Sequence, residues 1–145
     1  MEYLKEKIRE LSEKYFKEVL SIRKHIHAHP ELSFEEVNTA NFISAQLKKY
    51  GIKHRKGIAK TGIVALIEGG GEGEGESEKG KRGKNEKVRK WESEKVGKTI
   101  ALRADLDALP ILEKNNVPYR SKNPGVMHAC GHDVHSASML GVARI

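Results

Sequence analysis

Apolar residues recur at spacings of three and four along the first 26 residues of the chain. This spacing places them on one face of a helix, because about 3.6 residues make one helical turn. The opposite face is rich in Lys and Glu, as solvated surface usually is. The pattern predicts a long amphipathic helix that ends at Pro30. Its apolar positions are Leu4, Ile8, Leu11, Tyr15, Val19, Ile22 and Ile26.

A second helix is predicted to start at Ser33. Ser33 and Glu36 form the S-x-x-E pattern of a capping box, in which each side chain satisfies a backbone N–H of the first turn. Lys49 suits the last turn, and Gly51 is the expected stop. The residues that follow the helical spacing are Phe34, Val37, Ala40, Ser44 and Leu47.

Two short apolar runs predict strands. Residues 62–68 and 99–104 are rich in β-branched side chains, which is typical of buried strands, and we expect the two to be neighbours in one sheet. From about Val134 to the end, small and apolar residues predict a buried helix. Helices, then strands, then a helix indicate the α/β class, and specifically an α/β/α sandwich.

A charged, glycine-rich block lies between the two predicted strands. Residues 69–97 hold eight of the 14 glycines, eight basic and seven acidic residues, and few large apolar ones. Such a stretch buries too little surface to offset the entropy of ordering it, so it is predicted to be a flexible loop. A phosphate-binding loop is disfavoured, because Glu alternates with Gly and no Gly-Lys-Ser/Thr follows.

Composition and charge exclude several classes of protein. A chain of 145 residues allows one domain, and no window approaches the roughly 18 apolar residues that span a membrane. The net charge of +7 is spread along the chain, so we expect no nucleic-acid partner. A single cysteine excludes an intrachain disulfide, and the charged N-terminus lacks the pattern of a secretory signal. We therefore expect a cytoplasmic location.

The strongest chemical signal is the run Met127-His-Ala-Cys-Gly-His-Asp-Val-His135. Three histidines, the only cysteine and an aspartate within nine residues predict a metal site rather than scattered surface side chains. Gly131 lets the backbone turn so that Cys130 and His132 can face one ion. A structural zinc site would need a second Cys/His pair, which the chain lacks, so residues from elsewhere must complete the site.

Two further stretches carry titratable groups. Asp105 and Asp107 follow an apolar strand, at the edge where ligands bind in open α/β sheets, and they lie on one side if the strand continues. A solvated strand end explains the two aspartates equally well. The alternating histidines of His25-Ile-His-Ala-His29 point apart on a helix, so they are interpreted as surface, capping or packing residues.

Together these stretches resemble the M20 metallopeptidases. The resemblance rests on IRKHIHAHPELSFEE, TGIVALIEG, TIALRADLDALP and GVMHACGHDVHSASMLGVA, and it covers residues 1–68 and 98–145. It is strongest to the aminoacylases, carboxypeptidases, hippurate hydrolases and auxin-conjugate amidohydrolases. The block at 69–97 is longer than this family's usual connection.

The resemblance implies a site with two divalent metal ions. Cys130 corresponds to the bridging thiolate ligand and His132 to a ligand of one ion. Asp107 corresponds to the aspartate that supports catalysis by orienting a metal-bound histidine. Asp105 takes the place of a metal-binding histidine of other branches. Asp133 and His135 are expected to contact the metal ligands rather than the metal. A structural role is expected of His27, Pro30 and Glu31.

The implied activity is hydrolysis of amide bonds in N-acyl amino acids or peptides by metal-activated water. A thiolate ligand favours zinc, with cobalt or manganese as alternatives. The family's general-base glutamate, its other ligands and its lid or dimerisation domain would all follow Ile145. The chain is therefore expected to be an inactive, C-terminally incomplete part of a zinc-peptidase-like catalytic domain, able to form a homodimer only with the missing domain.

Two other functions remain open. The chain could be a non-catalytic metal-binding or interaction module, which predicts metal binding without turnover. It could also be a thiol enzyme in which His128 or His132 activates Cys130. Such an enzyme would keep its activity in a chelator and lose it on thiol alkylation, and it leaves Asp105 and Asp107 without a role.

Overall fold

The structure is a computed structural model that describes residues 1–69 and 99–145. The chain divides into two units, of which the first consists of residues 1–67 and 102–145. The second unit, residues 68–101, has no helix or strand among its described residues. The flexible loop predicted at 69–97 falls almost entirely outside the described residues.

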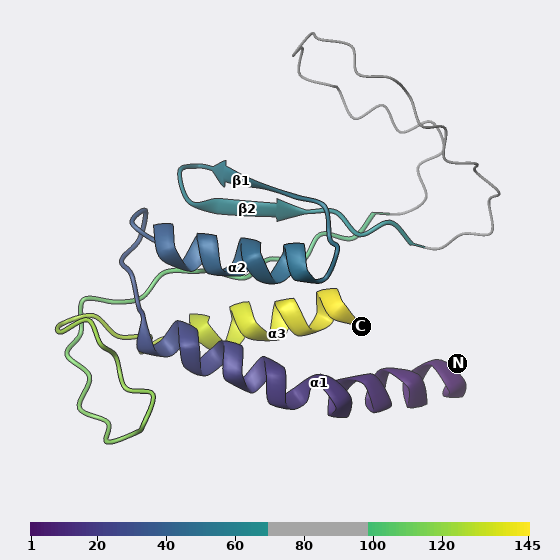
Figure 1. Ribbon diagram of the computed structural model, residues 1–145, viewed down its shortest axis with the longest axis horizontal. Helices are drawn as coiled ribbons and strands as arrows, with labels where there is room; N and C mark the ends of the chain where they lie inside the picture. Colours follow the sequence, from purple (N-terminus) through teal and green to yellow (C-terminus); the bar gives the residue numbers. More distant parts are fainter. Residues whose placement is uncertain (70–98) are drawn as a thin grey trace, which may run out of the picture. The chain divides into compact units, whose positions relative to one another are not determined.

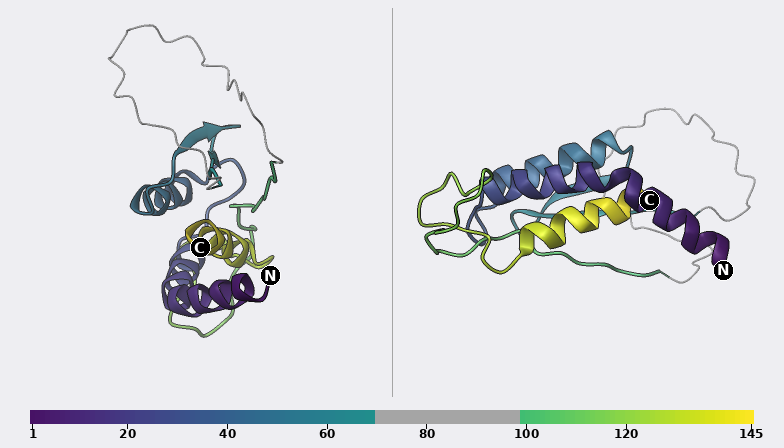
Figure 2. Two further views of the ribbon diagram at one scale, coloured as in Figure 1. Left: turned by 90° about the vertical axis from the view of Figure 1, so that its right-hand side faces the viewer. Right: turned by 90° about the horizontal axis from the view of Figure 1, so that it is seen from below.

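The first unit contains three helices and a two-stranded sheet. Its elements are α1 (Glu2–Ala28), α2 (Val37–Lys49), β1 (His54–Ile58), β2 (Gly62–Ala65) and α3 (His132–Arg144). The long helix α1 packs mainly on α3, and α2 packs on the hairpin of β1 and β2 (Figure 1). Views turned by 90° keep α1 and α3 side by side (Figure 2). This mixture of helices and sheet is what a partial α/β domain contains.

The three helices share one apolar core. Apolar area removed from water stabilises this packing. From the predicted face of α2 only Leu47 joins the core, together with Ile43, while Phe34 and Val37 are 60% and 57% exposed. The buried core residues are Ile22, Ile26, Ile43, Leu47, Ala137 and Leu140.

Only the second half of α1 takes part in this core. Leu4 and Ile8 belong to the predicted apolar face, yet they are 60% and 45% exposed. The reason is length: α1 has 27 residues and α3 has 13, so at about 1.5 Å per residue α3 can cover only half of α1. No helix in the described parts of the chain combines the length and apolarity needed to cross a membrane.

The start of α2 corrects the predicted capping box. Phe34 has φ of 64°, which a continuing helix does not allow, so α2 begins only at Val37. Glu36 instead accepts a hydrogen bond from Thr61 Oγ1 at 2.6 Å. The cap comes from Glu31, whose carboxylate accepts the backbone N–H of Asn38 at 3.1 Å and of Thr39 at 2.7 Å. The structural role expected of Glu31 is thus to begin α2.

The end of α2 is as predicted. Gly51 has φ of 73°, and its N–H donates to the carbonyl of Lys48 at 3.0 Å. The N–H of Ile52 donates to the carbonyl of Leu47 at 2.9 Å, which completes a Schellman motif.

The sheet differs from the prediction in its members. The apolar run at 62–68 does form β2, but its antiparallel partner is β1, whose basic sequence gave no strand signal. The run at 99–104, predicted as a neighbouring strand, has no strand assignment. A strand exists only where a second backbone completes its hydrogen bonds, and the described residues offer none to this segment. Ile100 and Leu102 are accordingly 82% and 64% exposed.

The last helix is confirmed with an earlier start. It begins at His132 rather than near Val134, and Ala137 and Leu140 are buried in it. It is not buried on all sides, because Val134 and Val142 are 45% and 57% exposed.

The contact of α1 with α3 is tested at Gly141. A Cβ there would lie 2.9 Å from Val19 Cγ2, and Val has one favoured rotamer in a helix, so it cannot move away freely. Ala favours a helix over Gly by about 1 kcal/mol, but overpacking costs about 1–3 kcal/mol. We expect Gly141→Ala to lower the free energy of unfolding in urea, and Val19→Ala to relieve part of that loss in the double variant. The exposed Ser138→Ala is the control; equal stabilisation by both alanines would contradict the close contact.

The Glu31 cap is tested by pH. Burial acts to raise the pKa of Glu31, but hydrogen bonds from Thr39 and Asn38 bring it below its ordinary 4.5. The stability that the carboxylate contributes is therefore complete above pH 4.5 and is lost as the pH falls through the lower folded-state pKa. We expect Glu31→Gln to cost about 1 kcal/mol at pH 7, and the difference from the wild-type chain to shrink below pH 4.5.

The control for this measurement is Glu35→Gln, an exposed residue of the same loop. A pH-independent difference between the Glu31 variant and the wild-type chain would show that the charge of Glu31 does not contribute to the cap.

Candidate metal centre

His132, one of the two predicted ligands, is the first residue of α3. Gly131 precedes it with φ of 91°, a left-handed conformation that residues with a Cβ rarely adopt. This turn leads the chain from Cys130 directly into the helix. Both candidate ligands therefore flank a single turn, as the sequence predicts.

Asp107 orients the ring of His132. The Nδ1 atom of His132 lies 2.9 Å from the carbonyl oxygen of Asp107 and 3.1 Å from its Oδ1. A carbonyl oxygen only accepts hydrogen bonds, so Nδ1 carries the proton and donates it. The other nitrogen, Nε2, then has the free lone pair that a metal ligand needs. An imidazole backed by a carboxylate in this way is the usual state of a metal-binding histidine.

Asp105 has different partners. Its Oδ1 accepts hydrogen bonds from Arg103 Nε at 3.0 Å and Nη2 at 2.8 Å. Its backbone carbonyl accepts the Ser136 hydroxyl at 2.8 Å, which fastens residues 105–107 to α3. The continuing strand that would place the two carboxylates on one side does not form, so Asp105 and Asp107 serve separate groups.

Cys130 and His135 are both exposed. The ring centroid of His135 lies 6.0 Å from that of His132, without a hydrogen bond between them. Within the described residues, no hydrogen bond links Cys130 to His128 or His132. The structure thus gives no support to a thiol activated by a neighbouring histidine.

Asp133, predicted to support the ligands, belongs to a buried ionic cluster that the sequence did not reveal. Its side chain is fully buried, and Oδ2 lies 2.7 Å from His27 Nδ1 and 2.8 Å from Arg23 Nε. His27 Nε2 lies 3.1 Å from Glu113 Oε1. The only sequence feature that pointed to this cluster is the motif around His27, because three alternating histidines on one helix cannot all face solvent. Nothing in the sequence marked Glu113.

His128 is a buried histidine of the same motif. It is 4% exposed, and neither ring nitrogen has a hydrogen-bond partner in the described part of the chain. Burial lowers its pKa to about 4, a shift opposed by the charge of Asp133 and assisted by that of His27. The ring is therefore neutral at pH 7.

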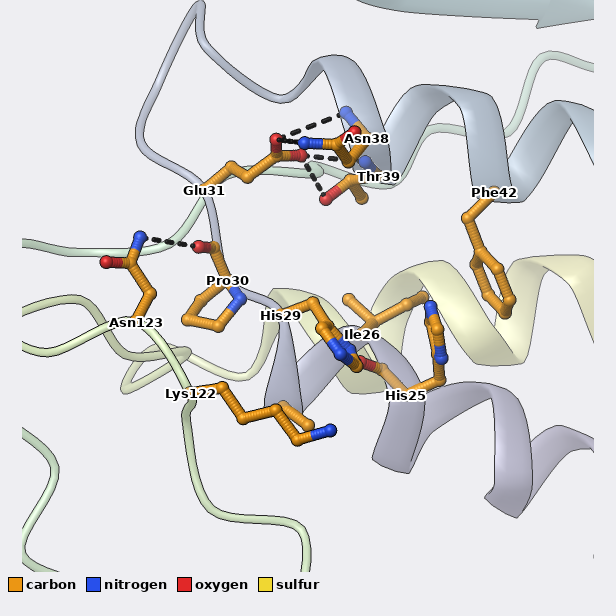
Figure 3. Close-up of a pocket in the computed structure, with 11 residues that line it drawn as sticks. His25, Ile26, His29, Pro30, Glu31, Asn38, Thr39, Phe42, Lys122 and Asn123 are labelled. Carbon is orange, nitrogen blue, oxygen red and sulfur yellow. Dashed lines mark hydrogen bonds between the residues drawn. The ribbon is translucent and has the colours of Figure 1, made fainter.

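A pocket of about 460 Å³ lies between the end of α1 and the start of α2 (Figure 3). His25 stacks on Phe42 at its wall, with ring centroids 4.0 Å apart. Asn123 Nδ2 donates to the carbonyl of Pro30 at 3.2 Å. None of the residues predicted for the metal site lines this pocket. It lies apart from the candidate ligands and contains no second set of them.

The donors fit a metal in kind but not in number. A thiol and an imidazole whose proton position is fixed suit zinc and similar divalent ions. No group of three or more His, Cys, Asp and Glu side chains that could hold an ion occurs within residues 1–69 and 99–145. Cys130 and His132 stay candidate ligands, and the prediction that further ligands are needed agrees with the absence of such a group within residues 1–69 and 99–145.

Comparison with known proteins gives consistent matches. Residues 101–145 match the model of peptidase family M20/M25/M40. The chain is 40% identical over 141 residues to an N-acyl-L-amino acid amidohydrolase of Geobacillus stearothermophilus, covering 97% of this chain and 32% of that protein. It is 45% identical over 127 residues to an N-acetyl-L-cysteine deacetylase of Bacillus subtilis, covering 88% and 25%. The chain spans about a third or less of the length of these relatives.

A solved structure agrees in fold. The Bacillus subtilis YXEP protein, described as a dinuclear metal-binding peptidase from the M20 family, superposes with a TM-score of 0.70 at 37% sequence identity. The match covers 91% of this chain and 31% of that one. The α/β class predicted from the sequence is confirmed by this match. The family model, the relatives and the fold agree that the chain is a relative of the M20 metallopeptidases, as its motifs indicate.

Proposed function

We propose that the chain supplies the first two ligands of the metal centre of an M20-type hydrolase that cleaves amide bonds in N-acyl amino acids or peptides. The observation that carries this proposal is the pair formed by His132 and Asp107, because the Nδ1–H hydrogen bond leaves Nε2 free for a metal. The relatives named as amidohydrolase and deacetylase support the reaction class.

The chain's own residues would orient the reacting groups. Bound ions would supply a polarised amide carbonyl and a water of lowered pKa. Asp107 keeps the proton of His132 on Nδ1, and the Ser136 hydroxyl fastens the Asp105 backbone to α3. These two hydrogen bonds fix the position of the segment that carries Asp107 relative to the helix that carries His132. Cys130, at the turn before α3, is the second proposed ligand. Asp133 would act from the cluster with His27, and His135 lies one helical turn after His132 without a hydrogen bond to it.

The proposed centre takes two divalent ions, with zinc favoured by the thiolate and cobalt or manganese as alternatives. Two donors bind an ion weakly, so we expect no turnover by the chain alone. A homodimer would require the lid or dimerisation domain of the family. A cytoplasmic location stays a prediction, and so does the absence of a nucleic-acid or membrane partner.

A second candidate is a metal-binding or interaction module without catalysis. The exposed positions of Cys130 and His135 favour it, since both side chains are open to an ion or a partner. It differs from the first proposal in one result: metal binds, but no enzyme built with this chain turns over.

Activity is tested in a chimera. We expect the Geobacillus amidohydrolase to keep hydrolysing N-acetyl amino acids when its matching segment is replaced by this chain, because the two are 40% identical over 141 residues. A chelator should abolish the activity. Asp107→Asn should lower kcat/KM by about 10–100-fold, as loss of a partner behind a ligand does, and His132→Gln should lower it further.

His29→Gln is the matched control, because His29 is an exposed histidine whose Nδ1 bonds only within its own helix. A folded chimera without activity would favour the non-catalytic module. Activity that survives the chelator and ends on thiol alkylation would favour a thiol enzyme.

Metal binding by the chain itself is tested with Co²⁺. A thiolate bound to Co²⁺ gives a near-ultraviolet charge-transfer band, so this band should appear at high Co²⁺ concentration and be absent in Cys130→Ser. His132→Gln should weaken it, and His29→Gln should not change it. An identical band in Cys130→Ser would exclude Cys130 as a ligand.

A further inference from the structure

The ionic cluster behind the candidate metal centre joins three separate segments. Arg23 and His27 lie on α1, Asp133 lies in the first turn of α3, and Glu113 lies in the segment between residues 105 and 131. His27, Asp133 and Glu113 are 4%, 0% and 2% exposed. Arg23, 25% exposed, closes the cluster on its outer side. Such a cluster needs close pairing, because each unpaired charge costs several kcal/mol on burial.

The positions of the protons follow from the geometry. His27 Nδ1 lies 2.7 Å from Asp133 Oδ2, and Nε2 lies 3.1 Å from Glu113 Oε1. Ionised carboxylates only accept hydrogen bonds, so this geometry allows each ring nitrogen to donate to one of them. Arg23 adds a guanidinium, 2.8 Å from Asp133 Oδ2.

Glu113 is prepared to be ionised in this cluster. Burial acts to raise its pKa, but hydrogen bonds from the Ser121 N–H, His27 and Asn115 bring the pKa below its ordinary value. The Ser121 N–H donates to Oε2 at 2.6 Å, so the two oxygens of the carboxylate have separate donors. His27 thus connects the carboxylate of Glu113, which Ser121 also holds, to the carboxylate of Asp133.

Both carboxylates that His27 contacts lie in segments that carry residues of the candidate metal centre. Asp133 directly follows His132, so its position sets that of the first turn of α3. The segment that carries Glu113 also carries Asp107, whose backbone carbonyl oxygen accepts the hydrogen bond from His132 Nδ1 at 2.9 Å. A core of apolar residues would stabilise the three segments at least as well as buried charges do. Paired charges also fix the relative orientation of the three segments, because all hydrogen bonds of the cluster form in one arrangement only.

We propose that His27 is a positioning residue of the metal centre: by donating from both ring nitrogens to Asp133 and Glu113, it holds the His132 ring against Asp107 with Nε2 free. The effect on metal binding rests on the proposed function. The effect on His132 does not, since it concerns the chain without metal.

The test is the protonation pattern of His132 in the metal-free chain, read from its ring ¹⁵N chemical shifts at pH 7. In the wild-type chain the neutral ring of His132 should be the Nδ1–H tautomer. His27→Gln removes one of the two donors, so a mixture of Nδ1–H and Nε2–H forms should appear. His25→Gln is the matched control, with the same substitution two residues away, at a ring that stacks on Phe42 outside the cluster.

Stability is separated from positioning by Glu18→Gln. Glu18 pairs with Lys49 at 3.0 Å and with Arg144 near the end of α3. This variant should unfold more easily without changing the His132 pattern. If His27→Gln does not fold, Glu113→Gln, which keeps the shape of the side chain, should give the same mixture in smaller proportion.

An unchanged Nδ1–H form in a folded His27 or Glu113 variant would overturn the proposal, and so would an equal change in His25→Gln or Glu18→Gln. The Co²⁺ band is measured on the same samples and should fall about tenfold or more in His27→Gln at fixed Co²⁺. A wild-type chain that shows the His132 pattern but no Co²⁺ band would refute the metal function and leave the positioning role intact.

Discussion

Three buried polar side chains, His27, Glu113 and Asp133, meet between α1, α3 and the segment 105–131, and Arg23 reaches Asp133 from the partly exposed side. We propose that the arrangement of the candidate ligands depends on this cluster. Taking charges out of water is costly unless each one meets an opposite charge in good geometry. His27 meets this condition with both ring nitrogens, at 2.7 and 3.1 Å from its two carboxylate partners. Any shift of α3 along α1 would break at least one of these contacts, so the register of the two helices is fixed.

Apolar packing and ionic contacts have different tasks in this fold. The shared core of the three helices supplies most of the stability, because it removes apolar area from water. Close packing at Gly141 sets how near α3 approaches α1, since Val19 occupies the space of a Cβ. The ionic cluster then sets rotation and register. The same division explains why the first half of α1, with neither contact, stays exposed.

The helices could be predicted because their signals are local. Spacing of three and four, a glycine stop and a proline breaker lie within the elements that they define, so α1, α3 and the end of α2 were found. The predicted capping box was wrong, because Phe34 adopts φ of 64° and Glu31 caps the helix instead. The hairpin was half missed because β1 consists largely of basic residues. The run at 99–104 shows the converse, since strand propensity without a partner makes no strand.

The sequence alone determined which residues can do chemistry here. The density of Cys and His around Cys130 marked the metal-site candidates, because these residue types in such spacing have few other uses. Asp105 and Asp107 were assigned to the site only through the family resemblance. Only the tertiary structure decided how they are used. It separated Asp105 from Asp107, gave His132 its proton position, and brought Glu113 to His27 across 86 residues. Contacts over such distances depend on how the helices pack, and no local pattern encodes them.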